Sequence, residues 1–347
     1  MKVIDLKDGD SFSGPLLVTD CKKCVNTNGK PYLAITFQDC SGQIAARLWE
    51  VTNQEEILKK GCVVHVEGKV LLYSKSLQIR IFKLSRDEMN LNPNDFAMSS
   101  PVKKDGLVAK LKAYVESISD SDLKILVANL VDRYLERLAI WPAAVKNHHE
   151  FESGLIYHSV TMADLGLQFC ATYPKLNRDL VLAGCLVHDF GKMIELSGLP
   201  NSEFTLDGKL LGHVSLGFYE VRKEAEKLGM HEFEFLPKEE QTKTSPLFHK
   251  HEMALMLEHI VLSHHGKYEF GSPVLPLTRE AYAVSCIDDF DAKMMILDKA
   301  YESSEKGDNT AKILTMDGRF FYNPFTLDVS SFPSGISLEK ELDELKK

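Results

Sequence analysis

The sequence lacks the features of a membrane or secreted protein. No run approaches the roughly eighteen consecutive apolar residues of a transmembrane helix, and the opening residues, MKVIDLKDGD, contain no apolar stretch of the kind found in secretion signals. Cysteine is sparse: the seven cysteines are an odd number without framework spacing, which argues against a disulfide scaffold and for a reducing compartment. We therefore expect a cytoplasmic protein with no membrane partner.

A zinc ribbon is not indicated either. Such a site needs Cys or His ligands in closely spaced pairs. Cys21 and Cys24 form the single C-x-x-C of the chain and have neither a second pair nor a neighbouring histidine. We expect ordinary strand or loop cysteines there, with a structural zinc ion as the alternative.

Basic charge is also scarce, because 41 Lys and Arg stand against 50 Asp and Glu, a formal net charge of −9. The deficit is uneven: residues 1–90 carry 13 basic against 11 acidic side chains, whereas the remaining 257 residues carry a net charge of −11. The first segment is therefore the better candidate for contact with a polyanion. The acidic remainder hints at a homo-oligomer in which only the first segments face such a polymer.

Residues 10–85 contain five segments that are rich in Val, Ile, Leu and aromatic residues and are separated by turn pairs such as Asn-Gly and Ser-Gly. A short helical pattern, TNQEEILKKG, lies between the third and the fourth segment. Three strands, a helix and two more strands is the order of a small OB-type barrel. We predict such a barrel over residues 1–90.

The rest of the chain has a different pattern. Residues 91–106 are rich in Pro, Asn, Ser and Gly and are predicted to be a linker. Over residues 107–305 apolar residues recur three and four apart, which predicts an all-α bundle. In the tail, 306–347, KILTMDGRFFYNPFT resembles a hairpin and LEKELDELKK a charged helical end. The predicted fold class is multidomain α+β: an OB-type barrel, a helical domain, and a short hairpin and helical tail.

Histidines and aspartates recur in one ordered pattern through the helical segment. Each lies at a helix end or on an inward face, and one His-Asp pair ends the very apolar LVLAGCLV, which should deliver both side chains into the interior. A core histidine bonded to its aspartate would explain that pair alone, but not the series. The series predicts a metal centre assembled from several helices. Its members are His158, His188, Asp189, His213, His264, His265 and Asp288.

Imidazole with carboxylate suits Mn²⁺, Fe²⁺, Co²⁺ or Zn²⁺ better than Ca²⁺, and one ion would not use so many ligands. We therefore expect two divalent ions, with Mn²⁺ favoured and Asp189 as the natural bridge. Two such ions can acidify a shared water and clamp a phosphoryl oxygen, so phosphoester hydrolysis is the expected reaction. The first ion would take His158, His188 and Asp288, and the second His213, His264 and His265.

His158, the pair His188-Asp189 and Asp288 match an H…HD…D signature, on which the chain resembles the HD-domain metal-dependent phosphohydrolases. The additional histidines are similar to those of the bimetal members, and H-D-F-G-K is similar to the H-D-x-G-K common among them. The resemblance implies that Asp189 is catalytic and that Lys192 faces the scissile phosphate. A surface lysine after a helix is the alternative for Lys192.

The order of the segments narrows the resemblance. An OB-type segment followed by an HD domain with GLIYHSV, LSHHGKYEFGSP and DDFDAK is similar to the YhaM-type 3′-to-5′ exoribonucleases of bacteria over nearly the whole chain. The resemblance implies hydrolysis of single-stranded RNA, with single-stranded DNA as a further substrate, to 5′-mononucleotides.

An OB face holds a single strand by stacking bases on exposed aromatic rings while Lys and Arg follow the backbone. We expect Trp49 and Tyr73 to stack and Arg47 and Arg80 to contact phosphate, although strand alternation places about half of the aromatic residues in the core. A barrel that docks another protein is the alternative. His149, before the first ligand helix, is a further candidate for substrate binding. Three other histidines are expected to be surface or packing residues: His249, His251 and His259.

Two other functions compete with the exoribonuclease. An HD phosphohydrolase could act on free or cyclic nucleotides with the barrel as a regulatory domain. Against the cyclic dinucleotide version, LSHHGKYEFGSP stands where that branch usually carries Gly-Tyr-Pro. The third interpretation is a nucleic-acid-binding module without activity, which the intact ligand series disfavours.

Overall fold

The computed structural model describes residues 1–49, 57–73, 76–87, 89–98, 100–144, 151–200 and 202–325. It divides into two compact units. The first comprises Met1–Ser99 with Gly198–Ser202, and the second Ser100–Ser197 with Glu203–Lys347.

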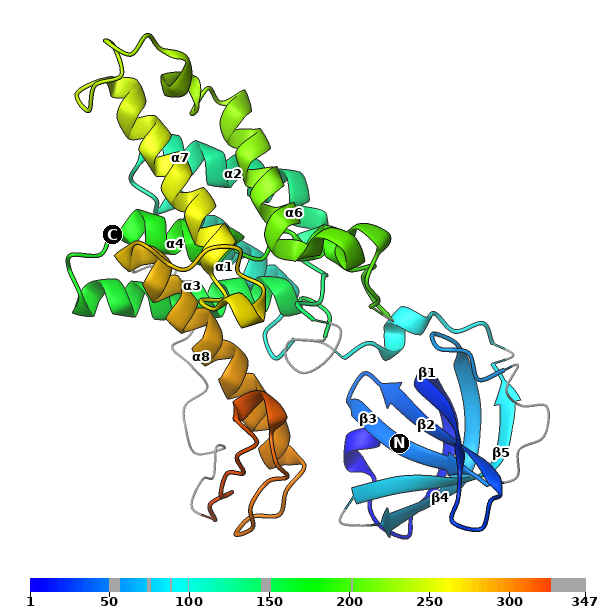
Figure 1. Cartoon of the computed structure of the whole chain (residues 1–347). Helices are drawn as coiled ribbons and strands as arrows, with labels where there is room; N and C mark the ends of the chain where they lie inside the picture. Colours follow the sequence, from blue (N-terminus) through cyan, green and yellow to red (C-terminus); the bar gives the residue numbers. More distant parts are fainter. Residues whose placement is uncertain are drawn as a thin grey trace. The chain divides into compact units, whose positions relative to one another are not determined.

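The first unit is a closed five-stranded barrel (blue and cyan in Figure 1). Neighbouring strands run in the order β1-β2-β3-β5-β4, and among the described strands only β3 and β5 pair in parallel. Alternate apolar residues such as Leu33, Ile35 and Phe37 point inward and are at most 1% exposed, as the period of a strand requires. The predicted OB barrel is confirmed. The strands are β1 (Ser11–Val25), β2 (Pro31–Asp39), β3 (Gly42–Leu48), β4 (Val63–Tyr73) and β5 (Ser76–Arg86). The first half of the predicted helix between β3 and β4, residues 52–56, lies outside the described residues, and its second half, residues 57–61, is not helical.

The stretch predicted as a linker, residues 91–106, contains structure that its composition did not indicate. Pro93–Phe96 forms a 3₁₀ turn, and Phe96 packs on Leu17 and Val63 of the barrel. The Gln38 amide donates a hydrogen bond of 2.9 Å to the Phe96 carbonyl. A single buried aromatic ring therefore fixes the start of the stretch, and its last residues already belong to helix α1 (Lys104–Glu116).

The second unit is a helical bundle, which confirms the predicted all-α domain (Figure 1). Buried residues three and four apart, such as Leu123, Leu126 and Leu130, place one face of each helix in a common apolar core. None of the described helices combines the length and the apolar character needed to cross a bilayer. The helices are α1 (Lys104–Glu116), α2 (Ser121–Leu138), α3 (Gly154–Thr172), α4 (Arg178–Val187), α5 (Lys192–Glu195), α6 (Leu206–Lys227), α7 (Pro246–Ser263) and α8 (Arg279–Glu302).

The described part of the tail contains the expected reversal of the chain, but not a regular hairpin. Isolated bridges join Asn309 to Tyr322 and Ile313 to Arg319. Asp317 and Gly318 both have positive φ, at 58° and 67°, which suits a tight turn. Residues 326–347, with the predicted helical end, lie outside the described residues.

Candidate metal centre and strand-binding groove

Helix α4 carries the His-Asp pair into the interior. The Asn177 side chain caps its first turn by accepting hydrogen bonds from two backbone amides. Leu180–Val187 are all buried, and the helix ends at His188, which is 0% exposed. The turn that follows packs tightly against α6, because a Cβ on Gly191 would lie 1.9 Å from the carbonyl oxygen of His213. Only glycine allows this approach, which brings His213 to the pair.

The first group of ligands lies between α3, α4 and α8. His158 Nε2 is 3.2 Å from His188 Nε2 and 3.2 Å from Asp288 Oδ1. Asp189 Oδ2 lies 3.3 Å from His188 Nε2 and 3.7 Å from His158 Nε2. These four side chains, from three helices and the turn after α4, thus face one point in the core.

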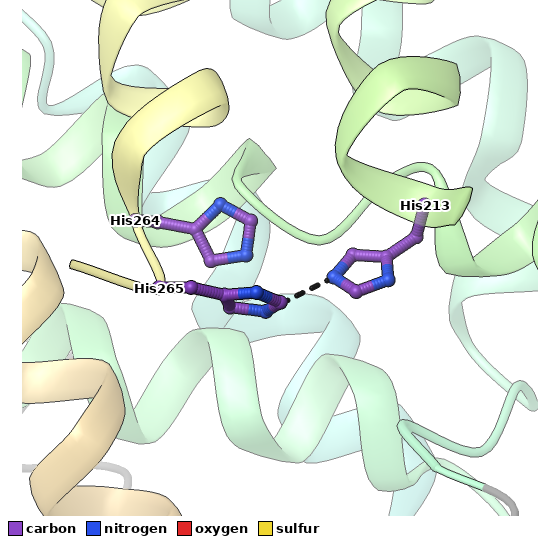
Figure 2. A group of neighbouring side chains, drawn as sticks. All are labelled: His213, His264 and His265. Atoms are coloured by element: carbon purple, nitrogen blue, oxygen red, sulfur yellow. Dashed lines mark hydrogen bonds between the residues drawn. The ribbon is translucent and has the colours of Figure 1, made fainter. Parts of the chain in front are cut away.

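The second group comes from α6 and the end of α7 (Figure 2). Gly212, with φ of +71°, interrupts the helical backbone and begins the run that carries His213. His213 Nε2 lies 3.2 Å from His265 Nε2. The His264 and His265 rings lie with their centroids 4.3 Å apart. One ligand atom from each of the three rings lies within 4.8 Å of the others.

Asp189 stands between the two groups. Its Oδ2 faces the first group, whereas its Oδ1 lies 3.5 Å from His213 Nε2 and 3.6 Å from His264 Nε2 of the second. Asp189 Oδ1 and His264 Nε2 are both buried without a hydrogen-bond partner. Buried polar atoms of this kind are costly unless something binds them. A divalent cation on each side of Asp189 fits these atoms.

All five histidine rings are oriented in the same way. Each Nδ1 lies against an acceptor: the carboxylates of Asp291 and Glu195, or a backbone carbonyl. Because these acceptors have no proton to give, each Nδ1 is the donor and each Nε2 is the nitrogen that is left to face an ion. The ring-to-acceptor pairs are His158 to Asp291, His188 to Cys185, His213 to Glu195, His264 to Val261 and His265 to Phe270.

Asp291 and Glu195 are positioning residues that the sequence pattern did not assign to this role. Asp291 Oδ2 accepts from His158 Nδ1 at 2.6 Å. Glu195 Oε1 accepts from both the backbone amide and Nδ1 of His213, at 3.0 and 3.1 Å. Both carboxylates are buried. The spacing Asp288-x-x-Asp291 on one helix is a signal that could have indicated Asp291; Glu195 has no comparable signal.

The ionisation of the centre suits cation binding. Burial opposes the charge on Asp189, but Lys192 and His188 hold the pKa of its carboxyl well below the usual range. Burial and the neighbouring His265 lower the pKa of His264. Burial also opposes a charge on His158, yet hydrogen bonds to Asp288 and Asp291 raise its pKa to about 9. The carboxylates are therefore ionised, and His158 would have to release a proton in order to bind an ion.

Lys192 lies at the centre and is not a surface residue. Its side chain is 11% exposed, and Nζ lies 2.7 Å from Asp189 Oδ2. Burial opposes its charge, but the Asp189 carboxylate raises its pKa. The Trp141 indole fixes the backbone here by donating to the Lys192 carbonyl at 3.1 Å. A charged amine therefore borders the carboxylate that joins the two groups of ligands.

Four residues of the barrel are predicted to bind the nucleic-acid strand, and all four lie along one groove of about 800 Å³: Arg47, Trp49, Tyr73 and Arg80. Trp49 and Tyr73 are 48% and 67% exposed. Tyr32 stacks on Trp49 with ring centroids 4.9 Å apart, and the Arg47 guanidinium lies 5.9 Å from the centre of the Tyr32 ring. The groove therefore combines exposed aromatic faces with cations. His149 lies outside the described residues.

Comparisons with known protein families agree with both units. A family model described as an HD domain matches residues 155–293, and one described as an OB-fold nucleic acid binding domain matches residues 17–86. A third model, built for a helicase family, matches residues 90–175, which include the 3₁₀ turn Pro93–Phe96 and helices α1, α2 and α3. The fold and the centre thus define an HD-domain hydrolase that binds divalent metal, joined to an OB-fold domain.

Similar proteins narrow the class further. The 3′-5′ exoribonuclease YhaM of Oceanobacillus iheyensis is 38% identical over 319 residues, which are 91% of this chain and 95% of that protein. The chain belongs to the YhaM family of 3′-5′ exoribonucleases. The second OB-fold domain of replication protein A from Methanococcus maripaludis, a solution NMR structure, is 20% identical with a TM-score of 0.21. That match covers 26% of this chain and 98% of the other.

Proposed function

We propose that the chain is a dinuclear metal-dependent exoribonuclease that removes 5′-mononucleotides from the 3′ end of single-stranded RNA. The observation that carries the proposal is the pair of ligand groups that share Asp189, with its two oxygens facing opposite groups. An in-line displacement at phosphorus needs a clamp on both the attacking and the leaving oxygen. Two ions on either side of one carboxylate would supply that clamp.

The ligand types favour Mn²⁺, with Co²⁺, Fe²⁺ and Zn²⁺ as chemically similar ions. The first ion would be held by His158, His188 and Asp288, and the second by the three histidines of Figure 2, with Asp189 shared. When bound, the two ions would activate water and neutralise charge on the phosphoryl group.

The chain's own groups hold this arrangement in place. Asp291 and Glu195 keep the Nδ1 proton on His158 and His213, so that both rings keep Nε2 toward the centre. The Lys192 amine, charged and near-buried, neutralises Asp189 when substrate is absent. When the scissile phosphate enters, the same amine would donate to a phosphate oxygen and offset its charge.

The barrel groove would hold the strand. Trp49 and Tyr73 offer ring faces for base stacking, while Arg47 and Arg80 offer cations for phosphates. Stacking is tolerant of sequence, because every base has a π face. Single-stranded DNA would enter the groove in the same way, and the preference for RNA rests on family membership. His149 remains a predicted phosphate contact.

The test uses single-stranded RNA labelled at its 5′ end, with a free or a phosphate-blocked 3′ end, in the presence of Mn²⁺. The free strand should shorten stepwise from its 3′ end, release 5′-mononucleotides and stop on addition of a chelator; the blocked strand should persist. Nucleoside triphosphates and cyclic dinucleotides are tested in parallel. Faster turnover of either than of RNA would replace the exoribonuclease with a nucleotide phosphohydrolase.

A cytoplasmic location and a homo-oligomer are further parts of the proposal. No disulfide joins any of the seven cysteines, all of which lie among the described residues, and this fits a cytoplasmic protein. The homo-oligomer stays a prediction from the acidity of the helical segment, and a mass measurement in solution tests it.

A further inference from the structure

A second group of buried histidines lies at the other end of α7. His231 precedes the 3₁₀ turn Glu232–Phe235, and His251 lies in the first half of α7; they are 2% and 7% exposed. His251 stands thirteen residues before His264, which is about 20 Å along a helix at 1.5 Å per residue. The group is therefore separate from the centre described above.

The contacts within this group repeat those of the centre. His231 Nδ1 and His251 Nδ1 lie 3.2 Å apart, the same separation as between the facing Nε2 atoms of His158 and His188. On its other side, His231 Nε2 donates to Glu258 Oε1 at 2.8 Å. His231 Nδ1 therefore keeps a lone pair that points at its neighbour. A histidine held by a carboxylate on one nitrogen is the usual arrangement of a metal ligand.

A carboxylate completes the set. Glu234 Oε1 lies 3.9 Å from His231 Nδ1, and one ligand atom from each of His231, Glu234 and His251 lies within 4.8 Å of the others. Two nitrogens bound to a tetrahedral ion at about 2.0–2.1 Å lie about 3.3 Å apart, which matches the separation of the two rings. The Glu234 side chain is 40% exposed, so it can adjust toward an ion and leaves a route from solvent.

The surrounding charge is negative. Arg222 contacts Glu226, Glu258 and Glu234, at 3.0, 3.4 and 3.5 Å. With both histidines neutral, three carboxylates and one guanidinium leave two negative charges, which one divalent ion would balance.

We propose that His231, His251 and Glu234 form a third metal site, which takes a borderline divalent ion of the Zn²⁺ class with solvent as the fourth ligand. The site joins the connection after α6 to α7. These same two helices carry His213, His264 and His265 near their other ends. The ion has a structural role: it closes the α6–α7 connection and thereby supports the spacing of the two helices.

The experiment counts ions bound by the full chain. Metal-stripped protein is titrated with Zn²⁺ against a chromogenic chelator, for the wild type, His251→Gln, Glu234→Gln and the matched control His249→Gln, an exposed histidine two residues away on α7. We expect His251→Gln to bind one equivalent fewer than the wild type, and Glu234→Gln to bind the third equivalent at least tenfold more weakly. His249→Gln should match the wild type.

Two further measurements keep the proposal open to refutation. RNA hydrolysis in saturating Mn²⁺ should be unchanged in Glu234→Gln, because its carboxylate is outside the catalytic centre. The melting temperature of the wild type, but not of Glu234→Gln, should rise when the third equivalent of Zn²⁺ binds. Equal Zn²⁺ stoichiometry and equal melting shifts in all four proteins would show a plain hydrogen-bond network and overturn the proposal.

Discussion

The two units of the chain present their candidate functional side chains in opposite ways. In the helical unit His188 and Asp189 are 0% and 2% exposed, and every histidine ring of the centre is held at Nδ1. In the barrel Trp49 and Tyr73 are 48% and 67% exposed on a groove open to solvent. Buried, interlocked ligands should fail together when one is lost, whereas exposed stacking residues should contribute singly and by small amounts. We therefore expect substitutions in the helical unit to change the rate of hydrolysis, and substitutions in the barrel to change the affinity for the strand.

The largest effect should come from Asp189→Ala, which removes the carboxylate shared by both groups of ligands. Turnover of single-stranded RNA should fall by roughly a thousandfold or more, on the order of losing a main electrostatic contribution to the transition state. The Kd for the strand, measured by fluorescence anisotropy, should stay within about twofold. Unchanged turnover would refute the metal assignment, and a parallel loss of binding would refute the separation of the two units.

A smaller effect is expected from Glu195→Gln, which leaves all seven ligands in place but weakens the hold on His213. Loss of such a partner typically costs about 10- to 100-fold in metal affinity or activity. Raising the Mn²⁺ concentration should restore much of the rate. Glu252→Gln, an exposed carboxylate on α7, is the control and should behave as the wild type; a rate for Glu195→Gln that no concentration of Mn²⁺ restores would indicate a different role.

Trp49→Ala tests the graded behaviour of the groove. Loss of the stacking ring should weaken binding of a long strand by about 1 kcal/mol, or about fivefold. This value is at the low end for contacts between a base and an aromatic ring, because the Trp49 ring is half exposed. We expect KM for long RNA to rise while kcat and the KM for a dinucleotide stay constant. If the dinucleotide suffers as much as the long strand, the groove does not hold the substrate.

The smallest effect should come from Arg47→Ala and Arg80→Ala, each of which removes one cation. The slope of log K against log salt should fall by about 0.7 for each phosphate that no longer meets a cation, as for single strands. A binding series in increasing KCl measures it. An unchanged slope would mean that these cations serve the barrel itself, for example through the contact of Arg47 with Tyr32.

Sequence reasoning reached the fold and the seven candidate ligands for physical reasons. Ligands at helix ends, such as His188 after an apolar run and His264 before Gly266, carry local signals of where the side chain must point. The barrel likewise follows from alternation and turn residues. These signals lie within short segments of the sequence, so they can be recognised without knowledge of the tertiary contacts.

What could not be predicted depends on contacts between distant segments. Glu195 holds His213 across 18 residues, and His231 meets His251 across 20. The 3₁₀ turn that contains Phe96 could not be predicted, because it lies in a polar stretch and a single aromatic residue gives no hydrophobic periodicity. Strand alternation could not say which face Trp49 takes, since it lies just past the end of β3.

The glycine after the His-Asp pair has a consequence for engineering. Any β-carbon at Gly191 would overlap the His213 carbonyl, so that even alanine must push α6 and its histidine away without altering a single donor atom. Such a substitution would retain the His158 side of the centre and loosen the other. If the centre holds two ions as proposed, this substitution would give a protein with one ion, in which the role of each cation could be studied separately.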